Sequence, residues 1–337
     1  MILILQKTLN KEENLELENQ LLPYQSFHSL LFSNQQIVVS EDTAWKATKQ
    51  QLLNFPFVKG IIEHNEPYPL VSKCLKKENT IVKVNDLFVG GTLLTIIAGP
   101  CSIENFSQLN NTAKLIQETK AHILRGGAFK PRSSPYSFQG LKEEGLKILK
   151  EFKQTNTIPI ISEIVDANQI PLFNETVDII QIGARNMQNY QLLKALAENN
   201  KPVLLKRNPA NTIEEWLMSA EYLLAGGNFN VILCERGNKT YDPLLPVSLN
   251  LNNIKTVKSL THLPLLVDPS HACGDSDLVS DSALSAILAG ADGLMIEVHE
   301  YPQRALSDGK QSLDFIQFSS LMEKLQELSV SIGRPLQ

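Results

Sequence analysis

The segment His122–Leu141, HILRGGAFKPRSSPYSFQGL, concentrates side chains that could bind an anion. It begins as an apolar strand, breaks at Gly126–Gly127 and continues as a basic loop rich in hydroxyl groups. Its basic and hydroxyl side chains are Arg125, Lys130, Arg132, Ser133 and Ser134. Arginine donates paired hydrogen bonds to phosphate, lysine supplies a point charge, and a Gly-Gly pair lets backbone N–H groups approach a ligand. The pattern favours a phosphate-binding loop at a strand end, with a solvated basic loop as the alternative.

Similar residue types follow other apolar segments along the chain. The basic members of the set are Arg125, Lys130, Arg132, Arg185, Lys206, Arg207 and Arg236. Other polar residues at such ends are Glu163, Glu235, Asp268 and His299. If these ends meet, the positive charge exceeds what one phosphate requires. Two phosphorylated substrates, or one phosphate and one carboxylate, would balance it.

A second set has the composition of a metal site, and its members are Cys101, His271, Glu297 and Asp308. Three of them have an ordinary explanation when taken singly: Cys101 as a small buried side chain, His271 as a polar loop residue and Asp308 as a turn residue. Together they offer sulfur, nitrogen and oxygen donors, which suit Mn²⁺, Fe²⁺, Co²⁺ or Zn²⁺. With one coordination position open, such an ion would polarise a carbonyl group.

Alternating strands and helices are predicted to position both sets. The predicted strands are Leu93–Ala98, His122–Leu124, Ile158–Ser162, Val177–Ile182, Pro202–Leu205, Val231–Cys234, Pro264–Val267 and Gly293–Glu297. Their continuous apolar runs are typical of strands covered by helices on both faces. Eight such units in about 250 residues predict an α/β fold, the (β/α)₈ or TIM barrel, with its chemistry at the carboxyl ends of the strands. The first, seventh and eighth strands adjoin in a closed barrel, so the candidate metal ligands would meet. An open doubly wound sheet remains the alternative, although no GxGxxG follows the first strand.

Residues 1–66 follow a different pattern. The predicted order is strand, helix, strand, strand, helix, strand, over Met1–Gln6, Lys11–Leu22, Ser29–Phe32, Gln36–Val39, a helix from Ser40 or Asp42 to about Asn54, and Val58–Glu63. This is the order of a small ferredoxin-like α+β domain. Residues 67–91 are predicted to form a linker with a short strand pair, and residues 92–337 the barrel. Because no catalytic cluster lies in residues 1–66, a regulatory role is predicted, with support of oligomerisation alone as the alternative.

Composition limits the classes of function. The chain has 337 residues, 43% of them hydrophobic, and a formal net charge of −5. This charge argues against nucleic-acid or anionic-membrane partners, so the basic clusters are expected to serve small anions. The four cysteines show no CxxC pair, which argues against a disulfide framework or structural zinc. The first five residues are apolar, too few for a signal peptide or membrane span, so a cytoplasmic location is expected.

Several motifs resemble those of one enzyme family. They are AGPCS, RGGAFKPRSSPYSFQGL, DIIQIGARNMQNY, PVLLKR, NTIEEWLMSAEYLLAGGN, VILCERG, LPLLVDPSH and ADGLMIEVH followed by ALSDGKQSLDF. These resemble the class I 3-deoxy-D-arabino-heptulosonate 7-phosphate (DAHP) synthases, and within them the bacterial beta subfamily with an N-terminal ferredoxin-like domain. The resemblance implies condensation of phosphoenolpyruvate with erythrose 4-phosphate, the first step of the shikimate pathway. It also implies a homotetramer, and tyrosine or phenylalanine as the effector.

The resemblance also implies roles for individual residues. The metal ligands would be Cys101, His271, Glu297 and Asp308, with Mn²⁺ as the expected metal. Phosphoenolpyruvate would bind to Arg125, Lys130, Arg185, Lys206 and Arg236. Erythrose 4-phosphate would bind to Lys130, Arg132 and Ser133. Asp268 is placed with the substrate-binding residues. The expected reaction is an aldol-like addition in which the metal and Lys130 polarise the aldehyde oxygen. Glu163 is the candidate to orient the attacking water, with an ion-pair role as its alternative.

Some positions depart from the subfamily pattern. Asp275–Ser276 replaces two arginines, Asn208–Pro209 follows Lys206–Arg207 where glycine is usual, and Asn238–Lys239 replaces Ile-Arg. Two other functions remain open. One is a related synthase that joins phosphoenolpyruvate to another aldose, of the 3-deoxy-octulosonate 8-phosphate or sialic acid type, and Lys130–Pro131–Arg132–Ser133 favours the erythrose substrate over it. The other is a phosphometabolite sensor without turnover, against which the complete Cys/His/Glu/Asp set argues.

Overall fold

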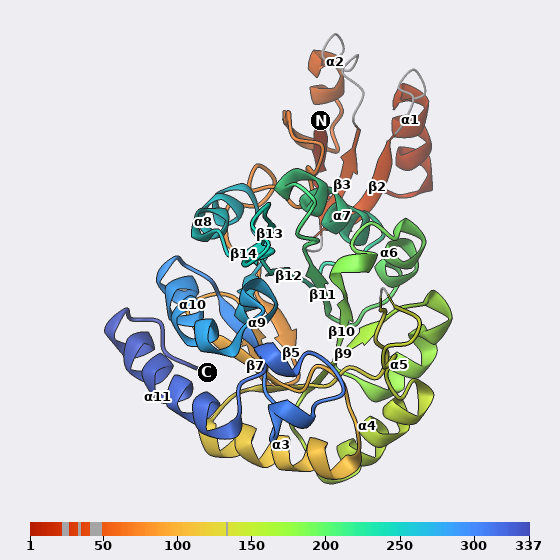
Figure 1. Cartoon of the computed structure of the whole chain (residues 1–337). Coiled ribbons are helices and arrows are strands. Elements are labelled where there is room, and N and C mark those ends of the chain that lie inside the picture. Colours follow the sequence, from red (N-terminus) through yellow and green to blue (C-terminus); the bar gives the residue numbers. More distant parts are fainter. Residues whose placement is uncertain (22–26, 33–34, 41–48, 133) are drawn as a thin grey trace.

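The computed structural model describes residues 1–21, 27–32, 35–40, 49–132 and 134–337 (Figure 1). Its main body is a closed barrel of parallel strands in the order β7-β8-β9-β10-β11-β12-β15-β16, with β16 paired back to β7. The barrel strands are β7 (Thr95–Gly99), β8 (Ile123–Arg125), β9 (Ile160–Ile164), β10 (Ile179–Ile182), β11 (Val203–Lys206), β12 (Val231–Glu235), β15 (Leu265–Val267) and β16 (Gly293–Glu297). The predicted barrel is thus confirmed.

Several strands extend further toward their carboxyl ends than predicted. Arg125, Lys206 and Glu235 are the last residues of their strands, and Glu163 is the next to last. Because these residues belong to strands paired on both sides, the ladder holds their backbone in place. Side chains that were expected on loops therefore start from rigid positions.

Helices cover the outside of the barrel (Figure 1). They are α3 (Phe106–Thr119), α4 (Glu143–Thr155), α5 (Ile170–Thr176), α6 (Tyr190–Ala197), α7 (Ile213–Ala225), α8 (Leu251–Leu260), α10 (Ser276–Leu288) and α11 (Phe315–Ser331). The short helix α9 (Pro269–Cys273) follows β15 and lies inside this ring (Figure 1). In α7, Thr212 and Glu215 form a capping box, and the buried Trp216 packs inward. The outer faces of the strands are thereby sealed from water, which leaves the barrel ends for function.

A hairpin fills the amino-terminal end of the barrel. It consists of β5 (Val82–Val84) and β6 (Leu87–Val89), which pair antiparallel within the predicted linker. Its apolar side chains join the barrel interior in one buried cluster of Val82, Val84, Val89, Ile97, Ile123, Ile161, Ile179, Leu204, Ile232, Cys234, Leu266 and Met295. Alternate residues of the barrel strands therefore point into the barrel interior.

The N-terminal region forms a separate antiparallel sheet in the order β2-β3-β1-β4. Its elements are β1 (Ile2–Leu5), α1 (Lys11–Leu21), β2 (His28–Phe32), β3 (Gln35–Val39), α2 (Lys49–Leu53) and β4 (Val58–Ile62). This arrangement agrees with the predicted ferredoxin-like pattern; the predicted start of the second helix at Ser40 or Asp42 leads into residues 41–48, outside the described part. One sheet face packs toward the barrel, where Phe32 meets Phe229 edge-on at 5.1 Å between ring centroids.

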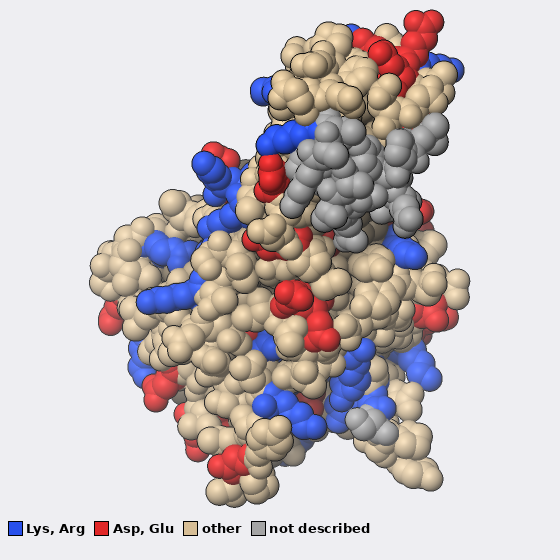
Figure 2. Space-filling model, turned by 90° about the horizontal axis from the view of Figure 1, so that it is seen from above, with Lys and Arg blue, Asp and Glu red and all other residues tan. Residues whose placement is uncertain are grey.

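Charged side chains of both signs are interspersed over the face seen in Figure 2. Among the described residues, no helix combines the length and apolar character needed to cross a membrane.

Candidate active site at the carboxyl ends of the barrel strands

A cavity of about 350 Å³ opens at the carboxyl ends of the barrel strands. The residues that line it are Arg125, Lys130, Pro131, Arg132, Glu163, Gln181, Gly183, Ala184, Arg185, Lys206, Asn208, Pro209, Arg236, His271, Asp308 and Gln311. All but one of the basic residues that the sequence grouped together therefore line one hollow. Of the two serines in the predicted anion loop, Ser134 is exposed and does not line the cavity, and Ser133 lies outside the described residues.

Arg207 is the exception, because its side chain points away from the cavity. It is 2% exposed and forms an ion pair with Glu235. Successive side chains of a strand point to opposite faces, so Lys206 enters the barrel while Arg207 lies on the outer side. The expectation that Arg207 joins the cationic mouth is wrong for this reason.

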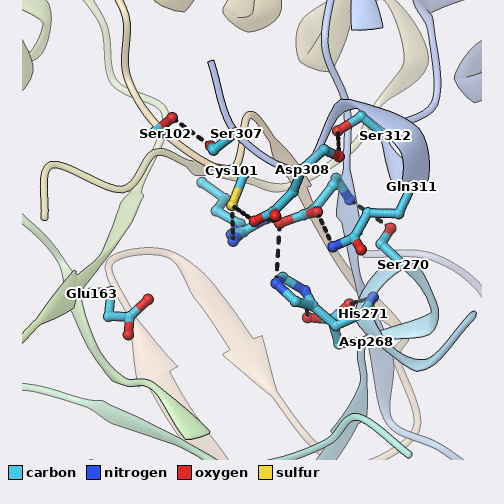
Figure 3. Close-up of polar contacts among 12 residues, drawn as sticks. Cys101, Ser102, Glu163, Asp268, Ser270, His271, Ser307, Asp308, Gln311 and Ser312 are labelled. Carbon is cyan, nitrogen blue, oxygen red and sulfur yellow. Dashed lines mark hydrogen bonds and ion pairs between the residues drawn. The ribbon is translucent and has the colours of Figure 1, made fainter. Parts of the chain in front are cut away.

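The four candidate metal ligands come together at one edge of the cavity. Cys101 follows β7, His271 lies in α9 after β15, Glu297 ends β16, and Asp308 precedes a short 3₁₀ turn, Gly309–Gln311. One ligand atom from each lies within 4.8 Å of the others. Figure 3 shows Cys101, Asp308 and His271 directed toward one another, with Glu163 apart from them.

Polar contacts within this group are short. The Cys101 thiol donates to Asp308 Oδ2 at 2.7 Å, and His271 Nε2 lies 3.4 Å from Glu297 Oε1. Arg125 Nη1 donates to the same Glu297 oxygen at 2.5 Å. Sulfur, imidazole and carboxylate donors so close together fit a divalent transition metal. The positive charge of such an ion would take the place of some of these hydrogen bonds and ion pairs.

The protonation states of the ligands follow from their burial and neighbours. Burial, with Glu297 close by, raises the pKa of the Cys101 thiol to about 12. Burial lowers the pKa of the His271 imidazole, and the opposing pull of Asp268 and Glu297 only partly offsets this. Burial alone would raise the pKa of the Glu297 carboxyl, but His271 and Arg125 hold that pKa below its usual range. At neutral pH the imidazole is therefore neutral and the carboxylate ionised, as metal ligands must be, while the thiol would release a proton on binding.

Asp268 lies behind the cavity and is fully buried. Its carboxylate accepts from the backbone N–H of His271 at 2.9 Å and contacts His271 Nδ1 at 2.8 Å. It also forms an ion pair with Lys206. The sequence placed Asp268 with the substrate-binding residues; the structure has it orienting one candidate metal ligand and one cation of the cavity.

Glu163 and Lys130 face each other across the cavity floor. Glu163 Oε2 lies 3.8 Å from Lys130 Nζ and accepts from Gln181 Nε2 at 3.3 Å. Burial by itself would lower the pKa of the Lys130 ammonium, but Cys101 and Glu163 raise it above its ordinary value. Lys130 is therefore a cation and a hydrogen-bond donor toward the cavity.

Gln311 is a site residue that the sequence argument did not identify. It lines the cavity, and its Nε2 donates to Glu297 Oε2 at 2.6 Å. Glu297 thus has both oxygens engaged, one by Arg125 and one by Gln311. The available signal was its place three residues after Asp308 in the same motif.

Comparisons with known proteins agree with this geometry. The family model described as the DAHP synthetase I family matches residues 76–333. A phospho-2-dehydro-3-deoxyheptonate aldolase from Thermotoga maritima is 44% identical over 296 residues, which are 88% of this chain and 87% of that protein. A 2-dehydro-3-deoxyphosphooctonate aldolase from Syntrophobacter fumaroxidans is 30% identical over 71% of this chain and 88% of its own length.

Solved structures extend the comparison to the whole chain. The crystal structure of the Thermotoga maritima phospho-2-dehydro-3-deoxyheptonate aldolase (DAHP synthase) has a TM-score of 0.79 and 38% identity, and covers 100% of this chain and 99% of that one. A truncated form of the Thermotoga maritima synthase has a TM-score of 0.74 and 41% identity over 80% of this chain. On the match of its barrel to the family model and of its full length to these structures, the chain belongs to the DAHP synthetase I family.

Proposed function

We propose that this protein is a DAHP synthase, which condenses phosphoenolpyruvate with D-erythrose 4-phosphate and water to give DAHP and phosphate. This reaction opens the shikimate pathway to chorismate and the aromatic amino acids. The observation that carries the proposal is the single cavity in which Lys130 and five arginine and lysine neighbours face a Cys/His/Glu/Asp group. Two phosphorylated substrates and a metal account for both halves of that cavity.

The basic residues divide between the substrates in this proposal. Arg125, Lys130, Arg185, Lys206 and Arg236 bind phosphoenolpyruvate, and Lys130, Arg132 and Ser133 meet erythrose 4-phosphate. Position supports part of this division, because Arg132 contacts Asp308 at 3.5 Å, whereas Arg185 follows β10 and Lys206 ends β11, further around the barrel. Arg125 and Arg236 contact the metal-ligand residues Glu297 and His271, so their assignment to phosphoenolpyruvate rests on the sequence motifs. The role of Ser133 rests on the sequence motif.

The chain's own residues carry the steps of the reaction. Cys101, His271, Glu297 and Asp308 would hold a divalent cation, most simply Mn²⁺, which would supply Lewis acidity for polarising a carbonyl group. Lys130 Nζ donates a hydrogen bond to the aldehyde oxygen, which develops negative charge as carbon three of phosphoenolpyruvate attacks the aldehyde carbon. The Glu163 carboxylate orients the water that adds to carbon two, and phosphate leaves from the resulting intermediate.

The test is a turnover assay on protein stripped with a chelator and then supplied with Mn²⁺, Fe²⁺, Co²⁺ or Zn²⁺ in parallel. Consumption of phosphoenolpyruvate should depend on both erythrose 4-phosphate and added metal. A five-carbon aldose phosphate serves as the control substrate, because one similar protein is named as a phosphooctonate aldolase. Turnover with that sugar alone would replace the proposal by the octulosonate reaction, and binding without turnover would favour a sensor.

The N-terminal region, residues 1–66, is proposed to regulate the barrel by binding tyrosine or phenylalanine. A second cavity of about 410 Å³ supports this, since it lies between the N-terminal sheet and α7. It is lined by His28, Leu30, Val39, Ser40, Pro67, Pro69, Leu70, Met218, Glu221, Tyr222 and Ala225, a largely apolar set that suits an aromatic side chain. We also propose a homotetramer in the cytoplasm.

A chain shortened to begin at Glu66 tests the regulatory role. It keeps Tyr68 and Leu70, which are buried against the barrel. The shortened enzyme should stay active and lose inhibition, and a coupling of about 1–3 kcal/mol would correspond to 5- to 150-fold inhibition of the full chain. Equal inhibition of both forms would contradict the regulatory role, and no response in either would favour a role in oligomerisation.

A further inference from the structure

Arg207 and Glu235 form a buried ion pair on the outer side of the barrel wall. They end adjacent strands, Arg207 directly after β11 and Glu235 as the last residue of β12. Arg207 Nε lies 2.9 Å from Glu235 Oε2 and Nη2 lies 2.8 Å from Oε1, a paired arrangement with exposures of only 2% and 1%. Such a geometry fixes orientation as well as charge.

Glu235 also holds the backbone that carries Arg236. Its Oε1 accepts from the N–H groups of Arg236 and Gly237, each at 2.8 Å. Arg236 in turn lines the cavity, and its Nη2 donates to the backbone oxygen of His271 at 3.3 Å. The Glu235 carboxylate therefore both neutralises Arg207 and holds the backbone N–H of Arg236, from which the Arg236 side chain extends into the cavity.

Two asparagines complete this network. Asn238, at the start of β13 (Asn238–Lys239), accepts from Arg207 Nη2 and from Asn253 Nδ2, the latter at 3.2 Å. The same Asn253 amide reaches Glu235 Oε2 at 3.3 Å. Asn238 is one of the departures from the subfamily pattern, where an isoleucine could not accept these bonds.

The Asn208–Pro209 departure lies next to the Asn238–Lys239 departure. Lys239 donates its backbone N–H to the Pro209 oxygen at 3.0 Å, which joins β13 to the loop after β11. Arg207 Nη1 donates to the Asn211 oxygen at 2.8 Å in that same loop. Asn208 and Pro209 line the cavity, so the network holds both a wall of the cavity and the base of Arg236.

We propose that Asn238 is a positioning residue for phosphoenolpyruvate: through Arg207, Asn253 and Glu235 it fixes the backbone that carries Arg236. The inference rests on the proposed function, because it takes Arg236 as a contact of phosphoenolpyruvate. Arg207 Nη2 also donates to Glu235 Oε1 at 2.8 Å and to the Gly237 oxygen at 3.1 Å, so it keeps two acceptors without Asn238. What the loss of the Asn238 oxygen removes is the contact that ties β13 to Arg207 and Asn253, the two side chains that hold the Glu235 carboxylate.

The experiment compares Asn238→Leu, which removes the acceptor, with Asn238→Asp, which keeps an oxygen in the same place. Asn253→Ala is a milder second perturbation, and Asn252→Ala is the matched control, since Asn252 is exposed on the same helix. Calorimetric titration gives Kd for phosphoenolpyruvate, turnover gives both KM values and kcat, and thermal unfolding gives Tm. Asn238→Leu should raise Kd and KM for phosphoenolpyruvate about tenfold with little change for erythrose 4-phosphate, and Asn238→Asp should restore most of the loss.

Three results would decide against the inference. Unchanged phosphoenolpyruvate affinity in Asn238→Leu and Asn253→Ala would overturn it outright. An equal loss for both substrates that follows Tm would show a structural role only. A wild-type chain that does not bind phosphoenolpyruvate would instead overturn the proposed function, and the inference with it.

Discussion

Gly183 makes room for the Glu163 carboxylate, and filling that room tests the role given to Glu163. A Cβ at Gly183 would lie 1.8 Å from Glu163 Oε1 and 2.6 Å from Cδ. Gly183 has φ −68° and ψ 158°, which alanine adopts without strain, so Gly183→Ala should fold. The carboxylate must move by more than about 1 Å to reach an ordinary contact distance. That shift would break its contacts with Lys130 and Gln181.

A misplacement of about 1 Å in a group that orients a reactant can lower the rate about 100-fold. We therefore expect Gly183→Ala to lower kcat by about that factor, measured by phosphate release at saturating substrates. Glu163→Ala should be similarly slow, and the double variant should be no slower than Glu163→Ala, since the methyl group then has nothing to displace.

Two outcomes would refute this reasoning. A wild-type kcat in Gly183→Ala would show that the position of Glu163 does not matter to turnover. A double variant much slower than Glu163→Ala would show that the added methyl group obstructs the substrate directly.

Three further predictions concern the metal, the anion contacts and pH. Cys101→Ala should lower bound metal, measured by elemental analysis, and turnover together, whereas the exposed Cys74→Ala should change neither; full activity of the first variant after chelation would contradict the ligand assignment. Arg236→Ala should raise KM for phosphoenolpyruvate and Arg132→Ala that for erythrose 4-phosphate, each by a contact worth about 1.5–3 kcal/mol; equal effects on both constants would show a wrong partition. Burial lowers the pKa of His262 to about 4, below the unfolded value of about 6.5, so its contribution to stability is present above pH 6.5 and is lost as pH falls toward 4. His262→Gln should therefore flatten the fall in Tm over that window, and identical pH profiles would rule this out.

The barrel and its cavity were predictable because buried parallel strands and strand-end side chains leave a strong pattern in the sequence. The direction in which a side chain points was harder to predict from the sequence. Arg207 was grouped with Lys206, yet alternation along a strand sends neighbours to opposite faces, and that rule could have separated them. Asp268 followed by Pro269 is the signature of a helix start, which indicates a carboxylate that accepts from the backbone of its own helix.

Other features could be identified only from the three-dimensional structure. Gln311 meets Glu297 only because the turn after Asp308 brings it back over the end of β16. The Asn208–Pro209 and Asn238–Lys239 departures are separate in the sequence, and no local pattern indicates that their backbones are hydrogen-bonded.

The hairpin at the amino-terminal end of the barrel also governs how the chain can fold. Its valines, Val82, Val84 and Val89, belong to one buried cluster that includes a residue from every barrel strand, from Ile97 in the first to Met295 in the last. A partly assembled barrel would leave part of this apolar cluster exposed to water. Contacts this distant in sequence make closure slow, and intermediates expose apolar surface until the last strand docks. The hairpin thus joins the first and last strands of the barrel in one buried cluster.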